Sequence, residues 1–445
     1  MKKVFFLLTV LCLFSWTGCS RGADPAPQPQ PSGKDGNTTV IYEANPKLFA
    51  KSNALKSIEG NLSRLQELGV NVLWLMPIYE IGEKNAFGSP YCVKDYKKVN
   101  PAFGSVDDLK SLVKEAHGRG MRVILDFVAN HTSWDNAWIT LHPDWYTQEG
   151  GVIISPKGMG WPDVADLNYS SNEMRAAMKD AMLFWVREAG VDGYRCDYAD
   201  GVPDDFWKDA IIDLRAVKGN DLLMLAESSQ EGHYQAGFDM LYAWSYCGNL
   251  PRLFSGVLNW TSLRDIYKNE MSSTPSGKKR MRYTINHDTA SSDGSPITLY
   301  KGEKGAMSAF VLSTFLEGVP MIYSSQEIGY SSTISIFEYK IMDWKSNSSY
   351  REEYRKVMKA YTSTASLRGN EPVLYNMGEI AAIGYAPSSS VKLAVFVNTT
   401  GTLQESKTPM ELSGAKVTDL VSGKESTLPL SLSLPAYEYR IFEIK

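Results

Sequence analysis

Short apolar runs alternate with amphipathic segments along the chain from Val40 to about Leu367. The run Val72–Met76 predicts a buried strand, because Pro77 ends it and Gly69 ends the helix-like stretch before it. The same pattern predicts strands at 123–127, 193–197, 222–227, 282–286 and 319–323, and helices at 58–68, 106–119, 171–189, 203–218 and 350–367. Counted in this way, about eight βα units fit the range.

Strands that all alternate with helices over this length favour a closed barrel over an open sheet. Periodicity alone does not exclude a doubly wound sheet. The segment after the first strand lacks a glycine-rich phosphate loop, however, and this counts against a nucleotide-binding fold. We therefore predict an α/β protein with a (β/α)8 TIM barrel formed by residues 40–130 and 169–369.

Two segments interrupt the alternation. Residues 131–168 lack regular periodicity and hold Trp134, Trp138, Trp145 and Trp161, and such a long irregular insertion after a barrel strand is usually functional. Residues 370–445 change to short alternating runs with Gly and Ser turns, and they predict a small C-terminal antiparallel β-domain. Because the tryptophans cannot all be buried in so short an insertion, we expect at least one of them to face the cleft.

The N-terminus has the pattern of an export signal. Lys2 and Lys3 precede an apolar run that is too short to span a bilayer, and residues 1–18 are predicted to be a signal peptide. Thr17-Gly18-Cys19 resembles a bacterial lipobox, although Trp16 replaces the usual leucine; ordinary signal cleavage is the alternative. Residues 19–39 carry four prolines and predict a tether. The protein is thus expected to be exported and lipid-anchored at Cys19, on a periplasmic or cell-surface face.

Charge and cysteine content exclude several classes of function. The net charge of −4 becomes −6 when the two lysines of the signal are removed, and no basic stripe is present to bind nucleic acid. A neutral ligand is therefore the default partner. Cys92, Cys196 and Cys247 lack the spacing of a zinc site or a disulfide framework. No stretch after the signal is long and apolar enough for a transmembrane helix.

Polar side chains recur where four of the predicted strands end. The constellations are Asp126 with Asn130-His131, Arg195 with Asp197, Glu227 alone, and His287-Asp288. A single acid after a strand is more often a helix cap, and a single histidine is more often a hydrogen-bonded core residue. Capping does not explain acids and histidines at successive strand ends, which is where barrel enzymes carry their catalytic groups.

Glycoside cleavage requires this set of residues. One carboxylate attacks or stabilises the anomeric carbon, and a second carboxyl group protonates the leaving oxygen. Arg195 and Asp197 lie two apart on a strand, so their side chains point the same way, and the guanidinium favours the ionised aspartate. Glu227 follows apolar residues and is expected near two aspartates, and both features raise the pKa of a carboxyl group as a general acid needs.

These motifs resemble, in order, the four signature regions of the α-amylase family, glycoside hydrolase family 13. The matching stretches are Asp126–His131, Gly193–Asp197, Ala226-Glu227 and Asn286–Asp288, with further likeness at 69–77, 166–168 and 318–323. The resemblance implies a barrel with an inserted domain B at residues 131–168 and a C-terminal antiparallel β-sandwich domain at residues 370–445. It implies that Asp197 is the nucleophile, Glu227 the acid/base, and Asp288 the residue that binds sugar hydroxyls. It also implies that Tyr91 stacks on the sugar and that His131, Arg195 and His287 line the subsite of the sugar to be cleaved.

The sequence departs from this family after the nucleophile. Most α-amylases continue with a small residue and then Lys-His, whereas this chain has Tyr198-Ala199-Asp200-Gly201. The departure puts in doubt both the Lys-His substrate contact and the usual calcium arrangement near domain B. No cofactor is needed for the chemistry, and a structural calcium ion has no clear ligand set in the sequence.

Several functions remain open on the sequence alone. The resemblance favours a retaining hydrolase of α-glucosidic bonds, mainly α-1,4 bonds of starch-derived glucans or maltooligosaccharides. A cyclodextrinase or neopullulanase, an α-1,6-glucosidase and a transglycosylase use the same three acids. A non-catalytic glucan-binding lipoprotein is an alternative from another class, and the intact set of acids counts against it.

Overall fold

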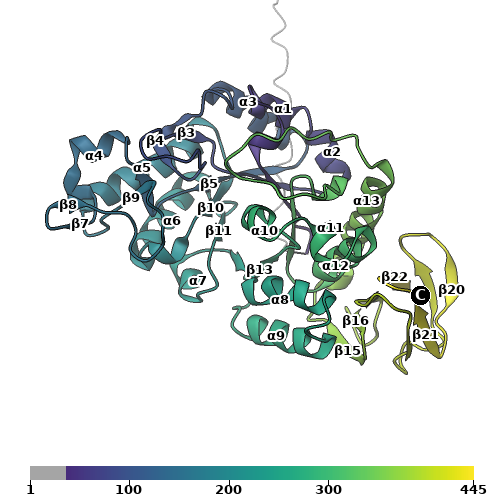
Figure 1. Cartoon of the computed structure of the whole chain (residues 1–445). Coiled ribbons are helices and arrows are strands. Elements are labelled where there is room, and N and C mark those ends of the chain that lie inside the picture. Colours follow the sequence, from purple (N-terminus) through teal and green to yellow (C-terminus); the bar gives the residue numbers. More distant parts are fainter. Residues whose placement is uncertain (1–36) are drawn as a thin grey trace, which may run out of the picture.

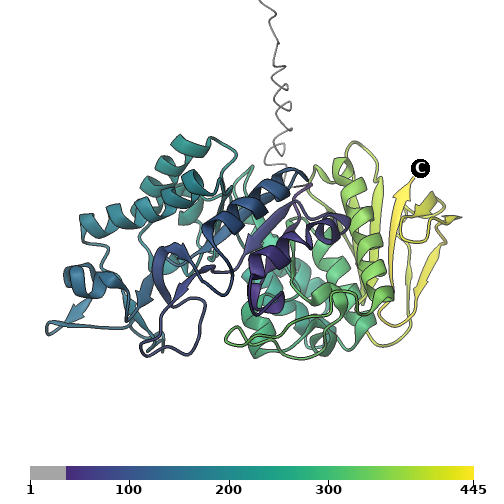
Figure 2. The ribbon, with the colours of Figure 1, turned by 90° about the horizontal axis from the view of Figure 1, so that it is seen from above.

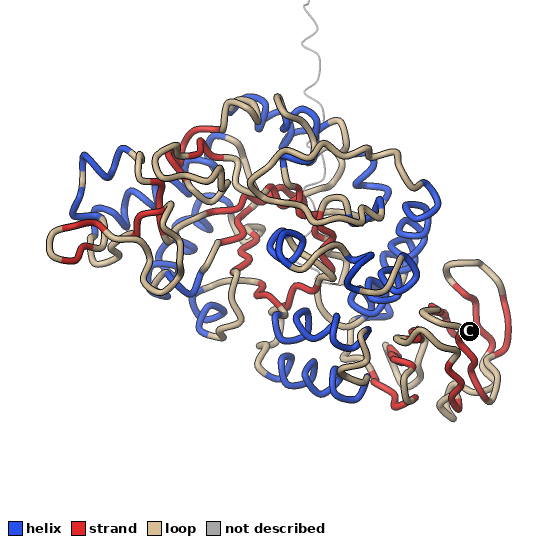
Figure 3. Tube along the Cα trace, viewed as in Figure 1, coloured by secondary structure: helices blue, strands red, loops and turns tan. Residues whose placement is uncertain are grey.

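The computed structural model describes residues 37–445, so the predicted signal peptide, Cys19 and most of the predicted tether lie outside it. Within the described range, eight parallel strands close into a barrel, in the order β1-β14-β13-β12-β11-β10-β5-β2. The strands are seen as the red ring at the centre of Figure 3. They are β1 Ile41–Ala44, β2 Val72–Leu75, β5 Arg122–Phe127, β10 Gly193–Cys196, β11 Leu223–Ala226, β12 Met240–Tyr242, β13 Lys279–Arg282 and β14 Val319–Tyr323. The predicted (β/α)8 barrel is confirmed.

Strand register sets the level of the polar groups in the barrel. Arg195 of β10 pairs with Asp126 of β5 on one side and with Leu225 of β11 on the other. The carboxyl ends of these three strands therefore lie at one end of the barrel. Gly193 is required at the start of β10: its φ is +148°, and a Cβ there would lie 1.9 Å from the backbone oxygen of Leu223.

Helices surround the barrel, and most predicted helices appear with small shifts in their ends. They are α1 Ala54–Glu59, α2 Leu62–Glu67, α3 Val106–His117, α5 Asn172–Glu188, α6 Asp204–Lys218, α7 Gly232–Ala236, α8 Trp244–Phe254, α9 Trp260–Ser272, α10 His287–Ser292, α11 Pro296–Leu299, α12 Glu303–Phe315 and α13 Ser348–Ser363. Ser105 starts α3 with a capping box to Asp108. Single-turn 3-10 helices lie at η1 Pro46–Leu48, η3 Ala199–Gly201, η4 Gln326–Ile328 and η5 Ala365–Arg368.

Two predicted elements were wrong in their extent. The predicted helix at 58–68 is two short helices, because Gly60 caps the end of α1 and α2 starts anew after Asn61. The predicted strand at 282–286 ends at Arg282 and begins at Lys279. Asn286 is instead the N-cap of α10, with its side chain accepting from the backbone N–H of Thr289, so the residues before it lead into a helix.

The segment between β5 and α5 projects from one side of the barrel, opposite the C-terminal strands (Figures 1 and 2). It pairs β6 His131–Ser133 with β9 Val164–Asp166, and it also holds α4 Ala137–Leu141, η2 Pro143–Trp145, β7 Gln148–Glu149 and β8 Val152–Ile153. A further antiparallel pair, β3 Tyr79–Ile81 and β4 Val93–Val99, follows β2. The β6–β9 pairing brings both ends of the insertion back to the barrel.

The C-terminal strands form two antiparallel sheets that share a small apolar core. One sheet has the order β15-β16-β17-β22-β19-β20 and the other pairs β18 with β21. Side chains from both sheets, including Phe396 and Leu434, meet in this core. The opposite face of the larger sheet packs on the barrel through α12, a helix buried over almost its whole length. The strands are β15 Val373–Met377, β16 Ile380–Tyr385, β17 Leu393–Asn398, β18 Gln404–Lys407, β19 Lys416–Asp419, β20 Glu425–Thr427, β21 Ser431–Leu434 and β22 Tyr439–Ile444.

Within residues 37–445, no helix has the length and apolarity needed to cross a membrane. Cys92, Cys196 and Cys247 are buried free thiols.

Candidate active site

A cavity of about 560 Å³ opens at the end of the barrel where β10 and β11 finish. Asp197, Glu227 and Asp288 line it, together with Tyr91, His131 and His287. Segments more than 150 residues apart in the sequence therefore place six of the predicted site residues around one space. A cavity of this size suits a small organic ligand such as a sugar.

Arg195 is completely buried, and it contacts the cavity-lining residues Asp197 and Glu227 rather than lining the cavity itself. Its Nη1 donates to Asp126 Oδ1 and to Asp197 Oδ1, both at 2.8 Å, and its Nη2 forms an ion pair with Glu227 Oε1 at 2.8 Å. Three carboxyl groups thus surround one guanidinium. One positive charge cannot compensate three negative ones in a buried site, so the cluster favours retention of a proton on one carboxyl.

The pKa directions of the two predicted catalytic groups follow from this shared arginine. Burial raises the pKa of Glu227 and outweighs Arg195, while the charges of Asp197 and Asp288 raise it further. Burial also raises the pKa of Asp197, although Arg195 lowers it by charge and by hydrogen bonding. The argument from sequence assigned Arg195 to Asp197 alone. The structure divides it among three carboxyls, and its stabilisation of ionised Asp197 is correspondingly smaller.

Tyr198 holds Glu227 through its backbone. The Tyr198 N–H donates to Glu227 Oε2 at 2.6 Å, and Tyr198 has a left-handed conformation with φ of 37°. A bulky residue rarely adopts this conformation, and such strain is commonly found at functional sites. The sequence analysis treated Tyr198 only as a departure from the family, so its contact with the predicted acid/base was missed.

The two site histidines carry different charges. Burial lowers the pKa of His131 to about 4, so this ring is neutral at pH 7. His287 is also buried, but the carboxylates of Asp288 and Glu43 raise its pKa to about 10, so it is a cation. Its Nδ1 lies 2.5 Å from Glu43 Oε1 and its Nε2 lies 2.7 Å from the Tyr91 hydroxyl. Imidazolium donates from both nitrogens.

Glu43 is a site residue that the sequence analysis did not identify. It is completely buried at the barrel end of β1, and it fixes the ring of His287. Tyr91 continues the chain of contacts, because its hydroxyl also donates to Asp126 Oδ2 at 3.3 Å. An explicit assignment of the first strand would have placed Glu43 at a strand end, where the other acids were recognised.

The four tryptophans of the insertion differ in position. Trp145 is buried, and Trp134 and Trp138 pack against the core as partly buried side chains. Trp161 lines the cavity, with its ring 5.5 Å from that of His131 and 5.3 Å from that of Tyr198. Trp161 is therefore the tryptophan that faces the cleft, and Trp244 at the start of α8 lines the same cavity.

Gly201 lies in the segment that departs from the family after the predicted nucleophile. A Cβ at Gly201 would lie 2.3 Å from Asn130 Oδ1 and 2.4 Å from the Tyr198 ring, so these two side chains fill the space. Asp200 in the same segment contacts Ser228 and His233. In the described part of the chain, no group of three acidic, histidine or cysteine side chains is arranged to hold a metal ion.

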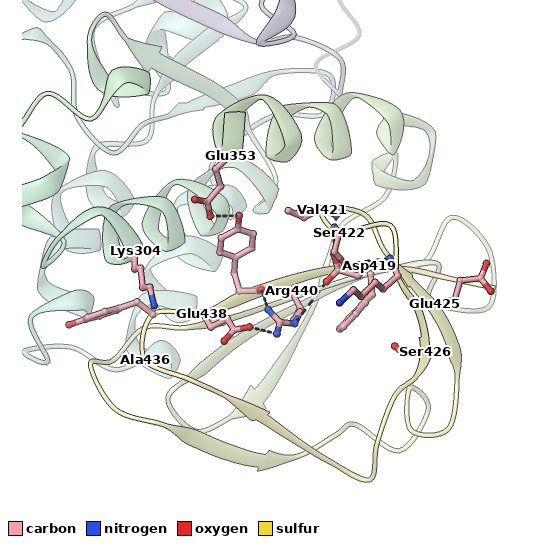
Figure 4. A pocket seen from close by; sticks show the side chains of 14 residues that line it. Lys304, Glu353, Asp419, Val421, Ser422, Glu425, Ser426, Ala436, Glu438 and Arg440 are labelled. Carbon is pink, nitrogen blue, oxygen red and sulfur yellow. Dashed lines mark hydrogen bonds and ion pairs between the residues drawn. The ribbon is translucent and has the colours of Figure 1, made fainter. Parts of the chain in front are cut away.

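A second cavity, of about 580 Å³, lies between the barrel helices and the C-terminal sheet (Figure 4). Several of its polar groups contact one another: Tyr439 donates to Glu353, and Arg440 pairs with Glu438 and Asp419. None of the predicted site residues lines it. The cavity at the barrel end is therefore the candidate active site.

A parallel barrel with two carboxyl groups in a cleft at the end of its strands is the arrangement that barrel glycoside hydrolases use. Comparison with known proteins agrees: residues 34–149 and 159–237 match the model of the α-amylase catalytic domain. The matched residues make up less than half of the chain, and they are similar to the catalytic domain of the α-amylase family.

Individual relatives extend the comparison beyond the matched segments. The chain is 28% identical to α-amylase 2 of Dictyoglomus thermophilum over 67% of its own length and 53% of that protein, so it spans about half of this relative. It is 24% identical to a cyclomaltodextrinase of Geobacillus thermopakistaniensis, covering 88% of this chain and 70% of that one. A crystal structure of an α-amylase from Lactobacillus plantarum matches with a TM-score of 0.81 and 28% identity, covering 92% of this chain and 99% of that chain.

Proposed function

We propose that the protein hydrolyses α-glucosidic bonds through a covalent glycosyl-enzyme intermediate, with retention of configuration. The observation that carries the proposal is the buried cluster of Asp197 and Glu227 around Arg195 at one cavity. Asp197 would attack the anomeric carbon while Glu227 gives its proton to the leaving oxygen. Glu227 would then take a proton from water, which attacks the same carbon and releases Asp197.

The other polar groups of the cavity have supporting roles in this proposal. The half-exposed carboxylate of Asp288 is suited to accept hydrogen bonds from sugar hydroxyls. Charged His287 lies 3.3 Å from Asp288, and its two N–H groups face Glu43 and Tyr91, so its role is to hold these side chains in place. Neutral His131 can also hydrogen-bond to a sugar without adding charge beside the developing oxocarbenium ion. Tyr91, which lines the cavity, would pack on the ring of the cleaved sugar in this proposal.

For the substrate we propose maltooligosaccharides or starch-derived glucans with α-1,4 bonds. The support comes from relatives whose names are α-amylase and cyclomaltodextrinase. A relative from Heyndrickxia coagulans, 27% identical over 36% of this chain, is named oligo-1,6-glucosidase, so cleavage of α-1,6 bonds is the second candidate. Incubation with maltooligosaccharides, pullulan, cyclodextrins and isomaltose, followed by product identification, separates these activities from transglycosylation and from glucan binding without cleavage.

The anomeric form of the first product tests the mechanism. Two displacements return the α configuration, and the reacting carboxyl groups of retaining enzymes lie about 5–5.5 Å apart. We expect NMR spectra of fresh hydrolysate to contain the α-anomer first, with the β-anomer appearing only by mutarotation. A β-anomer formed first would rule out Asp197 as a nucleophile.

Trp161 is expected to contribute to substrate preference. Its ring lines the cavity beside His131, and the flat face of tryptophan packs well on the C–H face of a sugar ring. Trp161→Ala should change the ratio of kcat/KM between long and short oligosaccharides by about 1–3 kcal/mol. Trp138→Ala is the matched control, because Trp138 packs on the core and does not line the cavity. Equal product profiles for the wild type and Trp161→Ala would contradict this role.

We further propose that the mature protein is anchored to a membrane through Cys19, which lies outside the described residues. The Thr17-Gly18-Cys19 motif and the proline-rich stretch after it support this proposal. Cys19→Ala should abolish metabolic labelling with fatty acid and release the protein from the membrane fraction. Because one acyl chain binds a membrane only marginally, stable anchoring requires more than one. A wild-type protein that is never labelled would refute the proposal.

A further inference from the structure

Side chains beside Glu227 join the two loops that follow β10 and β11, which are neighbouring strands of the barrel. One loop is the segment 198–203 after β10, and the other is the segment 227–233 after β11. Ser228 Oγ donates to Asp200 Oδ1 at 2.5 Å, so a direct hydrogen bond connects the loops. The proposed chemistry does not use Asp200, although it lies in the segment that departs from the family.

His233, in α7, belongs to the same cluster. The ring is buried, its Nε2 lies 2.9 Å from Asp200 Oδ1, and its Nδ1 lies 2.8 Å from Asp204 Oδ1 at the start of α6. Burial raises the pKa of Asp200, but hydrogen bonds from His233, Ser228 and Gln230 outweigh it and lower the pKa below its ordinary value. Asp200 is therefore an ionised group, only 23% exposed, that is held by several partners.

The cluster is next to the contact that holds the predicted acid/base. Asp200 lies two residues after Tyr198, and Ser228 directly follows Glu227. The Tyr198 N–H donates to Glu227 Oε2 at 2.6 Å, and Tyr198 has a left-handed backbone conformation. Such a conformation persists only when the surrounding structure maintains it. The hydrogen bond between Asp200 and Ser228 ties the residues after Tyr198 to the residue after Glu227, and it thereby helps to maintain this conformation.

Other contacts of the segment lead in a different direction. Trp207 Nε1 donates to the backbone oxygen of Ala199 at 3.1 Å, and the Gly201 N–H donates to the backbone oxygen of Tyr198 at 3.0 Å. These contacts fix the segment to α6 and close its own turn. Asp200, by contrast, ties the segment to the loop that carries Glu227.

We propose that Asp200 is a positioning residue for Glu227. Held by Ser228 and His233, Asp200 keeps the segment after β10 in place, so that the Tyr198 N–H stays against the Glu227 carboxyl group. The proposal rests on the proposed function, because it assigns the cluster to the step in which Glu227 gives its proton to the leaving oxygen. Tyr198 and Glu227 line the cavity but the three side chains of the cluster do not, so they act through the loops and not by contact with a substrate.

Two kinds of substrate separate positioning of the acid from general damage. Cleavage of maltopentaose needs the proton of Glu227, whereas an α-glucosyl fluoride needs little protonation in the first displacement. For Asp200→Ala, Ser228→Ala and His233→Gln we expect kcat/KM on maltopentaose to fall about 10- to 100-fold, mainly through kcat, because a misplaced catalytic group costs up to about 10²-fold. We expect kcat/KM on the fluoride to change less than about threefold. Asp200→Asn should recover most of the loss, since its amide oxygen still accepts from Ser228.

The pH profile gives a readout that a merely structural role would not move. Burial raises the pKa of Glu227, and the Tyr198 N–H opposes this increase, because a donated hydrogen bond favours the ionised carboxylate. Loss of that bond should raise the pKa further. Because Glu227 must be protonated, the alkaline limb of kcat/KM on maltopentaose should move to higher pH in Asp200→Ala. The variant retains the other charged or titratable groups around Glu227, which are Arg195, Asp197, Asp288, Tyr242 and Tyr283.

The controls separate positioning from folding. Asp209→Ala is the matched control, because Asp209 is exposed on α6 and lies 4.0 Å from Arg175, outside the cluster. It should leave both substrates unaffected. If Asp200→Ala fails to fold, Ser228→Ala still tests the cluster, since it removes a single hydroxyl group. Equal losses on both substrates, no loss on either, or an alkaline limb at the wild-type pH would overturn the positioning role.

Hydrogen–deuterium exchange distinguishes failure of this inference from failure of the proposed function. Peptides that cover residues 198–203 are compared between the wild type and Ser228→Ala without substrate. Exchange at least about 10-fold faster in the variant, with peptides of β5 unchanged, supports the role of the cluster even if the wild type cleaves no glycoside and the hydrolase function is wrong. Equal exchange rates overturn the inference, whether or not the protein is a hydrolase.

Discussion

Asp197→Asn is expected to lower kcat/KM on unactivated maltooligosaccharides by about 10⁴-fold, at the upper end of losses for positioned catalytic groups. An amide is too poor a nucleophile to form the glycosyl ester, so the first displacement is prevented. The fold should remain, because the amide oxygen of asparagine can still accept from Arg195 Nη1 in place of Asp197 Oδ1. Asp126 and Glu227 remain to compensate the buried guanidinium.

The measurement is the initial rate of reducing-sugar release, with thermal unfolding recorded on the same samples. Asp205→Asn is the matched control, since Asp205 lies on the exposed side of α6 and pairs with Arg175 away from the cavity. It should retain wild-type activity. Activity in Asp197→Asn within 10-fold of the wild type would exclude the proposed nucleophile.

The sequence predicted the barrel well because strand and helix patterns are local properties. β14 was predicted with the bounds that the structure has, and α3, α5 and α6 differ by one or two residues. The errors arose where helix-capping residues set the ends of the elements. Gly60 divides one predicted helix in two, and Asn286 starts α10 where a strand was expected. The short barrel strand β12 was not predicted, since three residues carry too little periodicity.

The acids of the site were predicted from sequence, whereas their environment was not. Strand ends and motif order identified Asp197, Glu227 and Asp288. The sharing of Arg195 among three carboxyls depends on the register of β5, β10 and β11, which no local pattern encodes. The charge of His287 likewise depends on Glu43, which lies 244 residues away in the chain. Long-range contacts of this kind set pKa values, and the three-dimensional structure is needed to find them.

Glu227 should be required for a different part of the reaction from Asp197, because it protonates the leaving oxygen whereas Asp197 attacks the anomeric carbon. Glu227→Gln is expected to reduce turnover of unactivated glucans by about 10²–10⁴-fold, because the leaving oxygen then departs without a proton. An activated substrate such as an α-glucosyl fluoride needs little protonation, so its first step should largely survive. Asp197→Asn, by contrast, should be inactive on both kinds of substrate.

The pH profile of the wild type follows from the raised pKa values of both groups. Asp197 must be ionised to attack, so kcat/KM should fall as pH drops through its pKa, and burial places this acid limb above the ordinary value of 3.8. Glu227 must be protonated, so activity should fall as pH rises through its raised pKa. Because the carboxyls share Arg195, the limbs belong to the cluster as a whole. In Glu227→Gln, measured on the fluoride, the alkaline limb should disappear.

Azide provides the sharpest test of Glu227. In Glu227→Ala the shortened side chain leaves room beside the anomeric carbon, and the variant lacks the base that activates water for the second displacement. Azide needs no base and can attack the ester formed with Asp197. We expect it to restore turnover of the fluoride and to yield the α-glucosyl azide, because two inversions restore the starting configuration. A β-glucosyl azide would mean that azide displaces fluoride directly without an Asp197 ester, and the division of roles between Asp197 and Glu227 would then be wrong.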